Sequence, residues 1–409
     1  MLKINERRFL ADLRELSLIG ATAEGGVSRP ALTAGDIEAR QWYRGKIAEA
    51  GLDYALDGAG NQSAILWSDP PSDKRILAGS HLDSVPDGGR YDGALGLLAA
   101  FEALRTMKDH GIRPALTLEA LNFTDEEGAI MGLMGSRALV GQLEAPDLER
   151  SKIAPEELSK RLEAAGISRE SMLRARRDDV LAWVELHIEQ GARLEDGNID
   201  IGVVDAIVGI RSLKLTLVGE AAHAGTKPMR QRRDALWGAA QFVLRARQHV
   251  MDNYSPGVCN IGMIRAEPGA FNIVPAQVDL ALEFRHGSLE EMAAMSDDLL
   301  GLLEQCAREF DLRASFEESP AVLPARMSEK VMSAIERAAA ALGLSHRRML
   351  SFAGHDSQSL AQVCPAAMFF VPSACGISHN PKEFTKDADC VNGANLMLHA
   401  LLELIDGFA

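Results

Sequence analysis

Histidine and acidic residues recur in short segments spread over most of the chain, a pattern typical of metal ligands. The candidates are His81, Asp83, Asp92, Glu126, Glu127, His187 and His379. A lone histidine near a strand end is more often hydrogen-bonded structure than a ligand, so the argument depends on the whole set. Imidazoles combined with carboxylates, without cysteine, suit zinc, manganese, cobalt or nickel.

Asp92 is the candidate for a carboxylate that bridges two cations, because a shared carboxylate offsets the repulsion between them. It lies in residues 88–93 (GGRYDG), where glycines allow the backbone to turn tightly and bring the carboxylate inward. One alternative is a simple turn with a helix N-cap at Asp92. A phosphate-binding loop is the other, but the Gly-Lys-Ser/Thr ending is missing.

Two close pairs of polar residues suggest that one member of each pair binds metal while the other has a supporting or catalytic role. His81 and Asp83 would point to the same face of a strand, so His81 can bind metal while the Asp83 carboxylate fixes its tautomer. Glu126 and Glu127 point in different directions, so one can bind metal while the other takes a proton from the attacking water. Burial and like charges would raise the pKa of that base. An exposed acidic helix start is the alternative, which the buried strand just before the pair disfavours.

These residues lie at or just beyond the ends of apolar runs that predict buried strands, at 75–79, 115–123 and 181–188. A helical pattern over residues 94–107 separates the first two runs. The order strand, helix, strand indicates a parallel sheet covered by helices. Sites in such sheets lie at the carboxyl ends of the strands, where the candidates fall.

The pattern changes beyond residue 209, where Leu213, Leu215 and Leu217 alternate with other residues as in half-buried antiparallel strands. Helical segments at 233–250 and 289–310 follow, and the α/β pattern returns near residue 325. We therefore predict an α/β catalytic domain, residues 1–210 and 326–409, with a mainly parallel, helix-covered sheet. Residues 211–325 are predicted to form an inserted α+β domain with an antiparallel sheet. Residues 144–179 are expected to form surface helices over the parallel sheet.

Composition narrows the class of protein. A net charge of −15, from 43 basic and 58 acidic residues, disfavours nucleic acid as a partner. Five cysteines without a Cys-x-x-Cys pair indicate reduced thiols. The sequence shows neither a signal-peptide core nor a run of about 20 apolar residues, so we expect a cytoplasmic protein without membrane contact. A serine hydrolase is disfavoured because no Gly-x-Ser-x-Gly elbow occurs.

Five strings resemble the N-carbamoyl-L-amino-acid hydrolase and allantoate amidohydrolase family. They are GSHLDSVPDGGRYDGALG (79–96), TDEEG (124–128), ELHIEQG (185–191), GEAAHAGTKPM (219–229) and GISHNPKE (376–383). That family belongs with aminoacylases and zinc-carboxypeptidase-like peptidases. The resemblance implies a zinc-aminopeptidase-like catalytic domain, and an inserted domain that forms a homodimer interface and closes over the site.

The resemblance also implies roles for individual residues. Two divalent ions per subunit would be held by His81, Asp92, Glu127, His187 and His379, with Asp92 bridging and Glu126 as general base. Implied substrate contacts are Gln190, His223, Asn272 and Arg285, with a loop at Gly354 and His355 bordering the substrate. His223 and Asn272 would reach the site across the dimer, where His223 would also stabilise the oxyanion. Arg285 would clamp the substrate carboxylate.

Two departures from the family pattern leave the substrate open. Residues 129–131 are Ala-Ile-Met where many members have Arg-Phe, and Glu283 replaces an aspartate two residues before Arg285. The expected activity is cleavage of an N-carbamoyl (ureido) L-amino acid to amino acid, ammonia and carbon dioxide. Alternatives are an allantoate amidohydrolase or β-ureidopropionase, or a dipeptidase or aminoacylase of the same clan. A noncatalytic metal or ligand sensor is the alternative from another class.

Overall fold

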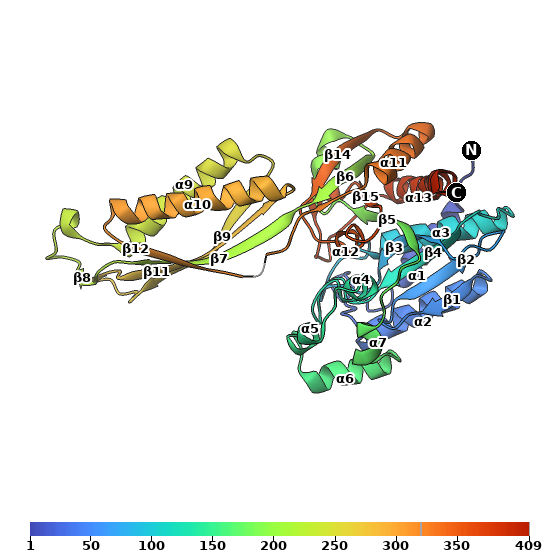
Figure 1. Cartoon of the computed structure of the whole chain (residues 1–409), viewed down its shortest axis with the longest axis horizontal. Coiled ribbons are helices and arrows are strands. Elements are labelled where there is room, and N and C mark those ends of the chain that lie inside the picture. Colours follow the sequence, from blue (N-terminus) through green and yellow to red (C-terminus); the bar gives the residue numbers. More distant parts are fainter. Residues whose placement is uncertain (320, 409) are drawn as a thin grey trace. The chain divides into compact units, whose positions relative to one another are not determined.

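The computed structural model describes residues 1–319 and 321–408 and divides the chain into two compact units (Figure 1). Unit 1 comprises Met1–Asp205 and Arg326–Ala409, and unit 2 comprises Ala206–Ala325. The sequence predicts boundaries after residues 210 and 325. The first observed boundary lies slightly earlier, in strand β6 (Ile201–Ile207), before β7 (Gly209–Val218) begins the sheet of unit 2.

A nine-stranded sheet, counted over the described residues, forms the centre of unit 1. Its order is β1-β2-β4-β3-β5-β15-β6-β13, with β14 paired to β6. The other strands are β1 (Asp53–Leu56), β2 (Gln62–Leu66), β3 (Arg75–His81), β4 (Thr117–Phe123), β5 (Val180–Ile188), β13 (Ala325–Arg326), β14 (His346–Ser351) and β15 (Ala366–Val371). Strands β4, β3, β5 and β15 run parallel to one another, so their carboxyl ends meet at one edge, whereas β2 and β6 on either side run antiparallel to them.

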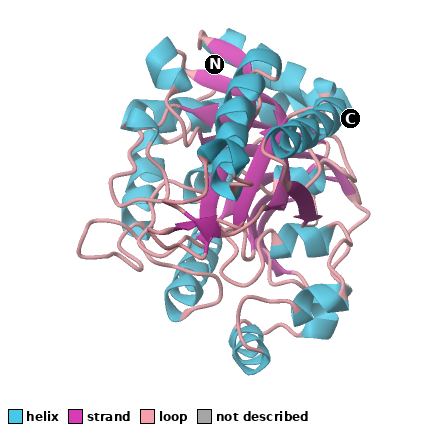
Figure 2. Cartoon of the chain, turned by 90° about the vertical axis from the view of Figure 1, so that its left-hand side faces the viewer, coloured by secondary structure: helices cyan, strands magenta, loops and turns pink. Residues whose placement is uncertain are grey.

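Unit 1 also contains helices, several of which pack against this sheet; Figure 2 shows helices beside the strands. They are α1 (Glu6–Leu16), α2 (Ala34–Glu49), α3 (Ala94–Asp109), α4 (Met134–Leu139), α5 (Ala145–Glu149), α6 (Pro155–Ala164), α7 (Arg169–Leu173), α8 (Arg193–Gly197), α11 (Glu329–Leu342), α12 (Ser357–Leu360) and α13 (Asp387–Phe408). Every residue of α3 from Ala94 to Met107 is buried, because this helix lies between the sheet and α13. Helices α4 and α12 contribute to another core with Leu77, Phe123 and Trp183. The rigid sheet therefore carries the loops at its carboxyl edge.

Helices α5 to α7 differ from the sequence prediction of helices over the sheet. Their buried residues Leu148, Leu158 and Met172 pack with Leu32 and Ile130 in a small separate core. No buried member of this core belongs to a strand of the described chain. The charged, Ala-rich segment thus packs on neighbouring loops and on α4, because it lacks the continuous apolar face that a sheet-covering helix needs.

Unit 2 contains a four-stranded antiparallel sheet in the order β12-β7-β11-β9, as described for residues 206–319 and 321–325. Besides β7, its strands are β9 (Val258–Glu267), β11 (Gln277–His286) and β12 (Arg313–Glu318). Helices α9 (Ala235–Asn253) and α10 (Leu289–Glu309) cover one face, where Leu215, Leu280 and Phe242 share a core. A short pair, β8 (Ala222–His223) with β10 (Ile273–Val274), extends beyond this sheet.

This architecture confirms the predicted fold class, a mainly parallel sheet with a separate antiparallel one. The alternation of leucines in β7 arises because Leu213, Leu215 and Leu217 face α9 and α10. Within residues 1–319 and 321–408, the chain has no helix whose length and apolar character would let it cross a membrane.

Candidate metal centre

The predicted ligands come together at the carboxyl edge of the parallel strands in unit 1. His81 ends β3, His187 is the penultimate residue of β5, and Glu127 follows β4. His379 follows β15, and Asp92 lies in the loop between β3 and α3. Residues separated by up to 298 positions therefore converge because neighbouring parallel strands end side by side.

The first group of candidate ligands consists of His81, Asp92 and His187. The Nε2 atom of His187 lies 2.9 Å from Oδ1 of Asp92, and that of His81 lies 3.7 Å from the same oxygen. All three side chains are buried. Burial lowers the pKa of His187, but the Asp92 carboxylate outweighs it and raises this pKa to about 9.

The second group consists of Asp92, Glu127 and His379. The Nε2 atom of His379 lies 3.4 Å from Oδ2 of Asp92 and 3.3 Å from Oε2 of Glu127. Hydrogen bonds to these two carboxylates raise the pKa of His379 to about 10. Asp92 thus turns one oxygen toward each group, which is the arrangement expected of a bridging carboxylate.

The donor atoms fit divalent cations. Ligands bound to one tetrahedral zinc ion at about 2.1 Å lie about 3.4 Å from one another, close to the separations in both groups. The Nε2 atom of His81 and the Oε1 atom of Glu127 are buried without a hydrogen-bond partner among the described residues. Buried polar atoms are almost always satisfied, so these two atoms indicate that a ligand belongs here.

The loop before α3 brings Asp92 inward rather than using it as a helix cap. Gly93 is the N-cap residue of α3, with φ of 64°. A Cβ atom on Gly93 would lie 2.4 Å from three atoms of the His81 ring, so only glycine fits between this loop and the imidazole. The alternative of an N-cap at Asp92 is therefore wrong, and its carboxylate is left to face the two histidines of the first group.

Glu126, the sequence candidate for the general base, lies beside the first ligand group. Its Oε2 atom lies 3.5 Å from Nε2 of His81, yet it belongs to neither ligand group. Burial, followed by the charges of Asp356 and Glu127, raises the pKa of Glu126 well above its usual range. A carboxylate with a raised pKa accepts a proton more readily near neutral pH.

Asp83 supports the site differently from the sequence prediction. The Nδ1 atom of His81 lies 2.9 Å from the backbone carbonyl oxygen of Asp83, so this carbonyl orients the imidazole with Nε2 toward the ligand group. The Asp83 carboxylate is 3.8 Å from the same nitrogen. It accepts hydrogen bonds from the backbone N–H groups of Glu126 and Glu127, at 3.3 Å and 3.2 Å. The carboxylate therefore positions the two glutamates.

Loop residues around the site adopt left-handed backbone conformations that non-glycine residues rarely show. They include Asp125 (φ 57°), Gln190 (φ 57°) and His379 (φ 52°). The Asp125 carboxylate accepts backbone hydrogen bonds from Ile130 and Met131, which holds the loop after β4. Gln190 donates from Nε2 to Oδ2 of Asp92 at 2.9 Å. Such conformations cluster at functional sites, where the surrounding structure maintains them.

The predicted loop at Gly354 and His355 borders the first ligand group. Gly354 is exposed, whereas His355 is buried with its ring centroid 4.4 Å from that of His187. The Nε2 atom of His355 lies 3.0 Å from the Ser351 hydroxyl. Burial, followed by the charge of His187, lowers the pKa of His355 well below its usual range. The structure thus places His355 as a buried ring packed against His187, a candidate ligand.

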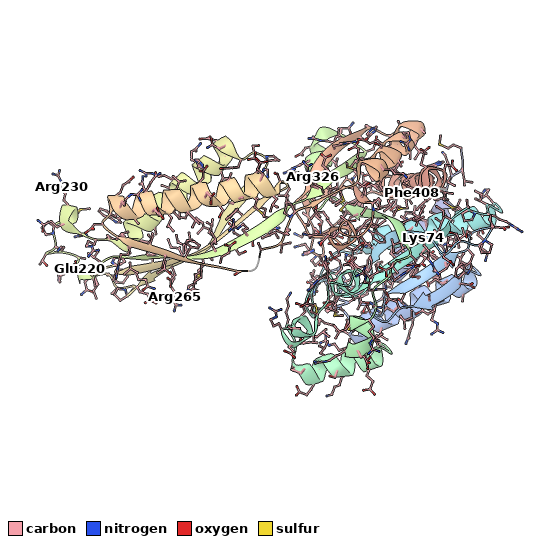
Figure 3. The ribbon with its side chains drawn as sticks, viewed as in Figure 1. Lys74, Glu220, Arg230, Arg265, Arg326 and Phe408 are labelled. Carbon is pink, nitrogen blue, oxygen red and sulfur yellow. The ribbon has the colours of Figure 1, made fainter. Side chains whose placement is uncertain are left out.

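The remaining predicted substrate contacts, His223, Asn272 and Arg285, lie in unit 2. His223 and Asn272 are near each other, whereas Arg285 is far from them along the sheet. The backbone carbonyl oxygen of Asn272 accepts from the backbone N–H of Ala224, next to the pairing of His223 with Ile273. Arg285 lies on β11, eight residues after Gln277. At about 3.3 Å per residue, this separation is about 26 Å along the strand. Figure 3 shows Glu220 and Arg230, which flank β8 in the sequence, at one end of unit 2.

Two further residues contact Asp92 and were not predicted as site residues. Ser378 Oγ lies 3.1 Å from Oδ2 of Asp92, and Glu383 accepts from the backbone N–H of Asp92 at 3.2 Å. Both belong to the string around His379 that carries the resemblance. Their polar side chains flank a candidate ligand, which is a weak signal that could have singled them out.

A family model described as peptidase family M20/M25/M40 matches residues 77–403 of this chain. The chain belongs to this family. The matched range includes every candidate metal ligand. Membership in this metal-dependent family confirms the predicted clan and agrees with the ligand groups found in unit 1.

Similar proteins confirm the narrower resemblance. An N-carbamoyl-L-amino acid amidohydrolase of Geobacillus stearothermophilus is 36% identical over 408 residues, covering 99% of this chain and all of that protein. An allantoate amidohydrolase of Bacillus subtilis (strain 168) is 33% identical, with 98% of each chain covered. A solved amidase of the hydantoinase/carbamoylase family from Burkholderia multivorans has a TM-score of 0.90 and 34% identity, with 98% of each chain covered. The predicted class, a hydrolase of non-peptide carbon–nitrogen bonds, is thereby confirmed.

Proposed function

We propose that this protein hydrolyses N-carbamoyl-L-amino acids to the amino acid, ammonia and carbon dioxide. The observation that carries the proposal is the position of Asp92, whose two oxygens face two separate groups of metal-type ligands. The relative from Geobacillus stearothermophilus, similar over its whole length, supports this substrate class.

Two divalent cations per subunit are the proposed cofactors. His81, Asp92 and His187 would hold one, and Asp92, Glu127 and His379 the other. Zinc, manganese, cobalt and nickel all suit this ligand mixture. When bound, such ions supply charge stabilisation for a scissile carbonyl and lower the pKa of water.

Glu126 is proposed to carry the proton. Its raised pKa and its position beside His81 suit it to take a proton from the attacking water and pass it to the leaving nitrogen. Water attack on the ureido carbon and release of the amino acid nitrogen leave carbamic acid, which breaks down to ammonia and carbon dioxide. The Asp83 carboxylate holds the backbone of this base and of Glu127 in place.

Substrate contacts are proposed for Arg285, Gln190, Gly354, His223 and Asn272. Arg285 suits the substrate carboxylate, because a guanidinium forms two parallel hydrogen bonds to such a group. The Nδ1 atom of His223 accepts from the backbone N–H groups of Gly225 and Thr226, which leaves its Nε2–H as a donor. That exposed donor suits an oxyanion.

A homodimer is proposed because one copy of unit 2 cannot supply all these contacts to one small substrate. Arg285 lies about 26 Å along β11 from the end that adjoins β8 and β10, which is longer than a carbamoyl amino acid. We therefore propose that Arg285 serves the site of its own chain, while His223 and Asn272 serve the site of the partner.

The surface of unit 2 offers a place for the second copy. β9 is an edge strand with Val258, Met263 and Ile264 at 43%, 41% and 52% exposure. On α9, Trp237, Leu244 and Met251 are exposed at intervals of seven residues, which places them on one side of the helix. An open edge and an apolar stripe on the helix that packs on β9 suit pairing with a second copy.

Allantoate is the second candidate substrate, because the Bacillus subtilis relative is 33% identical over nearly the whole chain. Allantoate also carries ureido groups beside a carboxylate, so the same contacts would serve it. The reaction would again be hydrolysis of a ureido carbon–nitrogen bond by the same base.

The test is turnover by chelator-treated protein reloaded with each of the four ions. Substrates are N-carbamoyl-L-amino acids, N-carbamoyl-β-alanine, allantoate, N-acetyl amino acids and dipeptides. The proposal predicts metal-dependent release of ammonia and amino acid from the N-carbamoyl-L-amino acids. Faster cleavage of dipeptides or N-acetyl amino acids would contradict it, and absence of any turnover by the reloaded protein would favour a noncatalytic sensor.

A further inference from the structure

Glu383 forms a buried connection between two loops that carry candidate ligands. It lies between His379 and α13, and only 2% of the residue is exposed. Its Oε1 atom accepts from the backbone N–H groups of Tyr91 and Asp92, at 3.0 Å and 3.2 Å. A buried carboxylate is costly unless its oxygens are satisfied, so this geometry fixes the loop of Asp92 against the loop of His379.

Gly89 provides an independent sign that the two loops are built to meet at this carboxylate. A Cβ atom on Gly89 would lie 1.9 Å from the Oε1 and Cδ atoms of Glu383. The backbone of the Asp92 loop therefore passes directly against the carboxylate of Glu383. A side chain at residue 89 would displace this carboxylate from its hydrogen bonds or move the loop.

Ser378 continues the connection from Glu383 to the side chain of Asp92. Its Oγ atom lies 3.0 Å from Oε2 of Glu383 and 3.1 Å from Oδ2 of Asp92. That Asp92 oxygen is the one that faces His379, at 3.4 Å. The Ser378 hydroxyl has one proton, so it donates to one of these two carboxyl groups at a time. Glu383 thus holds Asp92 directly at its backbone N–H and shares the Ser378 hydroxyl with the Asp92 side chain.

We propose that Glu383, together with Ser378, is a positioning residue that sets the affinity of the Asp92, Glu127 and His379 group for its cation. This inference rests on the metal site of the proposed function and adds residues that hold its ligands. Groups that orient metal ligands typically change metal affinity by about 10- to 100-fold when removed. The effect should be greatest for the ion of this group, because Ser378 precedes His379 and contacts the oxygen that faces it.

The test measures metal binding directly, by titrating chelator-treated protein with zinc or cobalt in calorimetry and following cobalt by its absorption. In Glu383→Ala, one of the two binding steps should lose about 10- to 100-fold in affinity while the other changes less, with an altered cobalt spectrum. Glu383→Gln should stay close to wild type, because its oxygen accepts both N–H groups and its amide donates to Ser378. A glutamine variant as weak as the alanine variant would contradict the proposal.

Glu119→Ala is the matched control, since Glu119 is also a buried glutamate with several hydrogen bonds, near the start of β4. Its metal affinity should equal that of wild type, and a loss equal to that of Glu383→Ala would overturn the proposal. Unchanged binding in Glu383→Ala would overturn it as well. If Glu383→Ala does not fold, Ser378→Ala provides the test instead. The proposal predicts that Ser378→Ala binds the metal ion more weakly than wild type, and wild-type affinity in this variant would contradict it. A wild-type protein that binds no ions would instead refute the metal site itself.

Discussion

The Nε2 atom of His187 lies 2.9 Å from the Oδ1 atom of Asp92, and both side chains are buried. Burial favours the neutral form of Asp92, but the charge and hydrogen bond of His187 outweigh it and hold the pKa of Asp92 well below its usual range. His187 and His379 each approach the Asp92 carboxylate with their Nε2 atom. A metal ion would bind to the same nitrogen atoms. Protons and cations therefore compete for the same atoms.

Metal affinity should depend on pH. With pKa values of about 9 for His187 and about 10 for His379, both rings are protonated at neutral pH, and a cation must displace these protons. Affinity should therefore rise with pH up to about 9 to 10, and binding of two ions at pH 7 should release about two protons. Calorimetry in buffers of different ionisation enthalpy measures this release. Affinity independent of pH from 6 to 9 would contradict the assignment.

Glu126→Gln should lower kcat by about 10²- to 10⁴-fold while leaving metal affinity near wild type, because the amide cannot accept the proton. The neighbouring substitution Glu127→Gln is the matched control, and it should weaken binding of the ion shared with His379. Metal titrations alongside steady-state kinetics separate the two effects. Equal metal loss in both variants would show that Glu126 is a ligand.

Gly93→Ala should lower the free energy of unfolding by about 1–3 kcal/mol and weaken metal binding as well. The reason is that its φ is 64° and a Cβ atom would lie 2.4 Å from the His81 ring. Gly111→Ala is the control, with φ of 66° and nothing within 4 Å of the added atom. Urea unfolding should show a cost for both variants, whereas only Gly93→Ala should lose metal affinity. Wild-type metal binding by Gly93→Ala would refute this account of the loop.

Contacts across a dimer should appear as complementation. His223→Ala and Glu126→Gln should each be nearly inactive alone, yet a heterodimer would contain one site with an intact Glu126 and an intact partner His223. Heterodimers isolated through two affinity tags after coexpression should have up to about half of wild-type activity, because one of their two sites is intact. Mixed preparations that stay as inactive as the single variants would place His223 in the site of its own chain.

Much of the site could be predicted because its chemistry follows strand ends. His81 and His187 occupy the ends of β3 and β5, and parallel pairing brings these ends together without any information on loops. The separate character of unit 2 was visible in the alternation of Leu213, Leu215 and Leu217, since only a half-buried strand needs that period.

Hydrogen bonds within loops were not predictable, because they depend on backbone conformations that packing determines. The pairing of the Asp83 carboxylate with backbone N–H groups requires the left-handed turn at Asp125, which no periodicity indicates. The contact of Glu383 with Asp92 joins residues 291 positions apart, and the glycine at residue 89 and the closeness of Glu383 to His379 in the sequence are weak traces of it. The burial of His355 likewise depends on packing against His187.

The most direct measurement is anomalous diffraction from crystals of the protein loaded with zinc or manganese. The account predicts two cations per chain, each within about 2.0–2.2 Å of an Asp92 oxygen, with His81 and His187 on one and Glu127 and His379 on the other. A single ion, or ions bound away from Asp92, would contradict it.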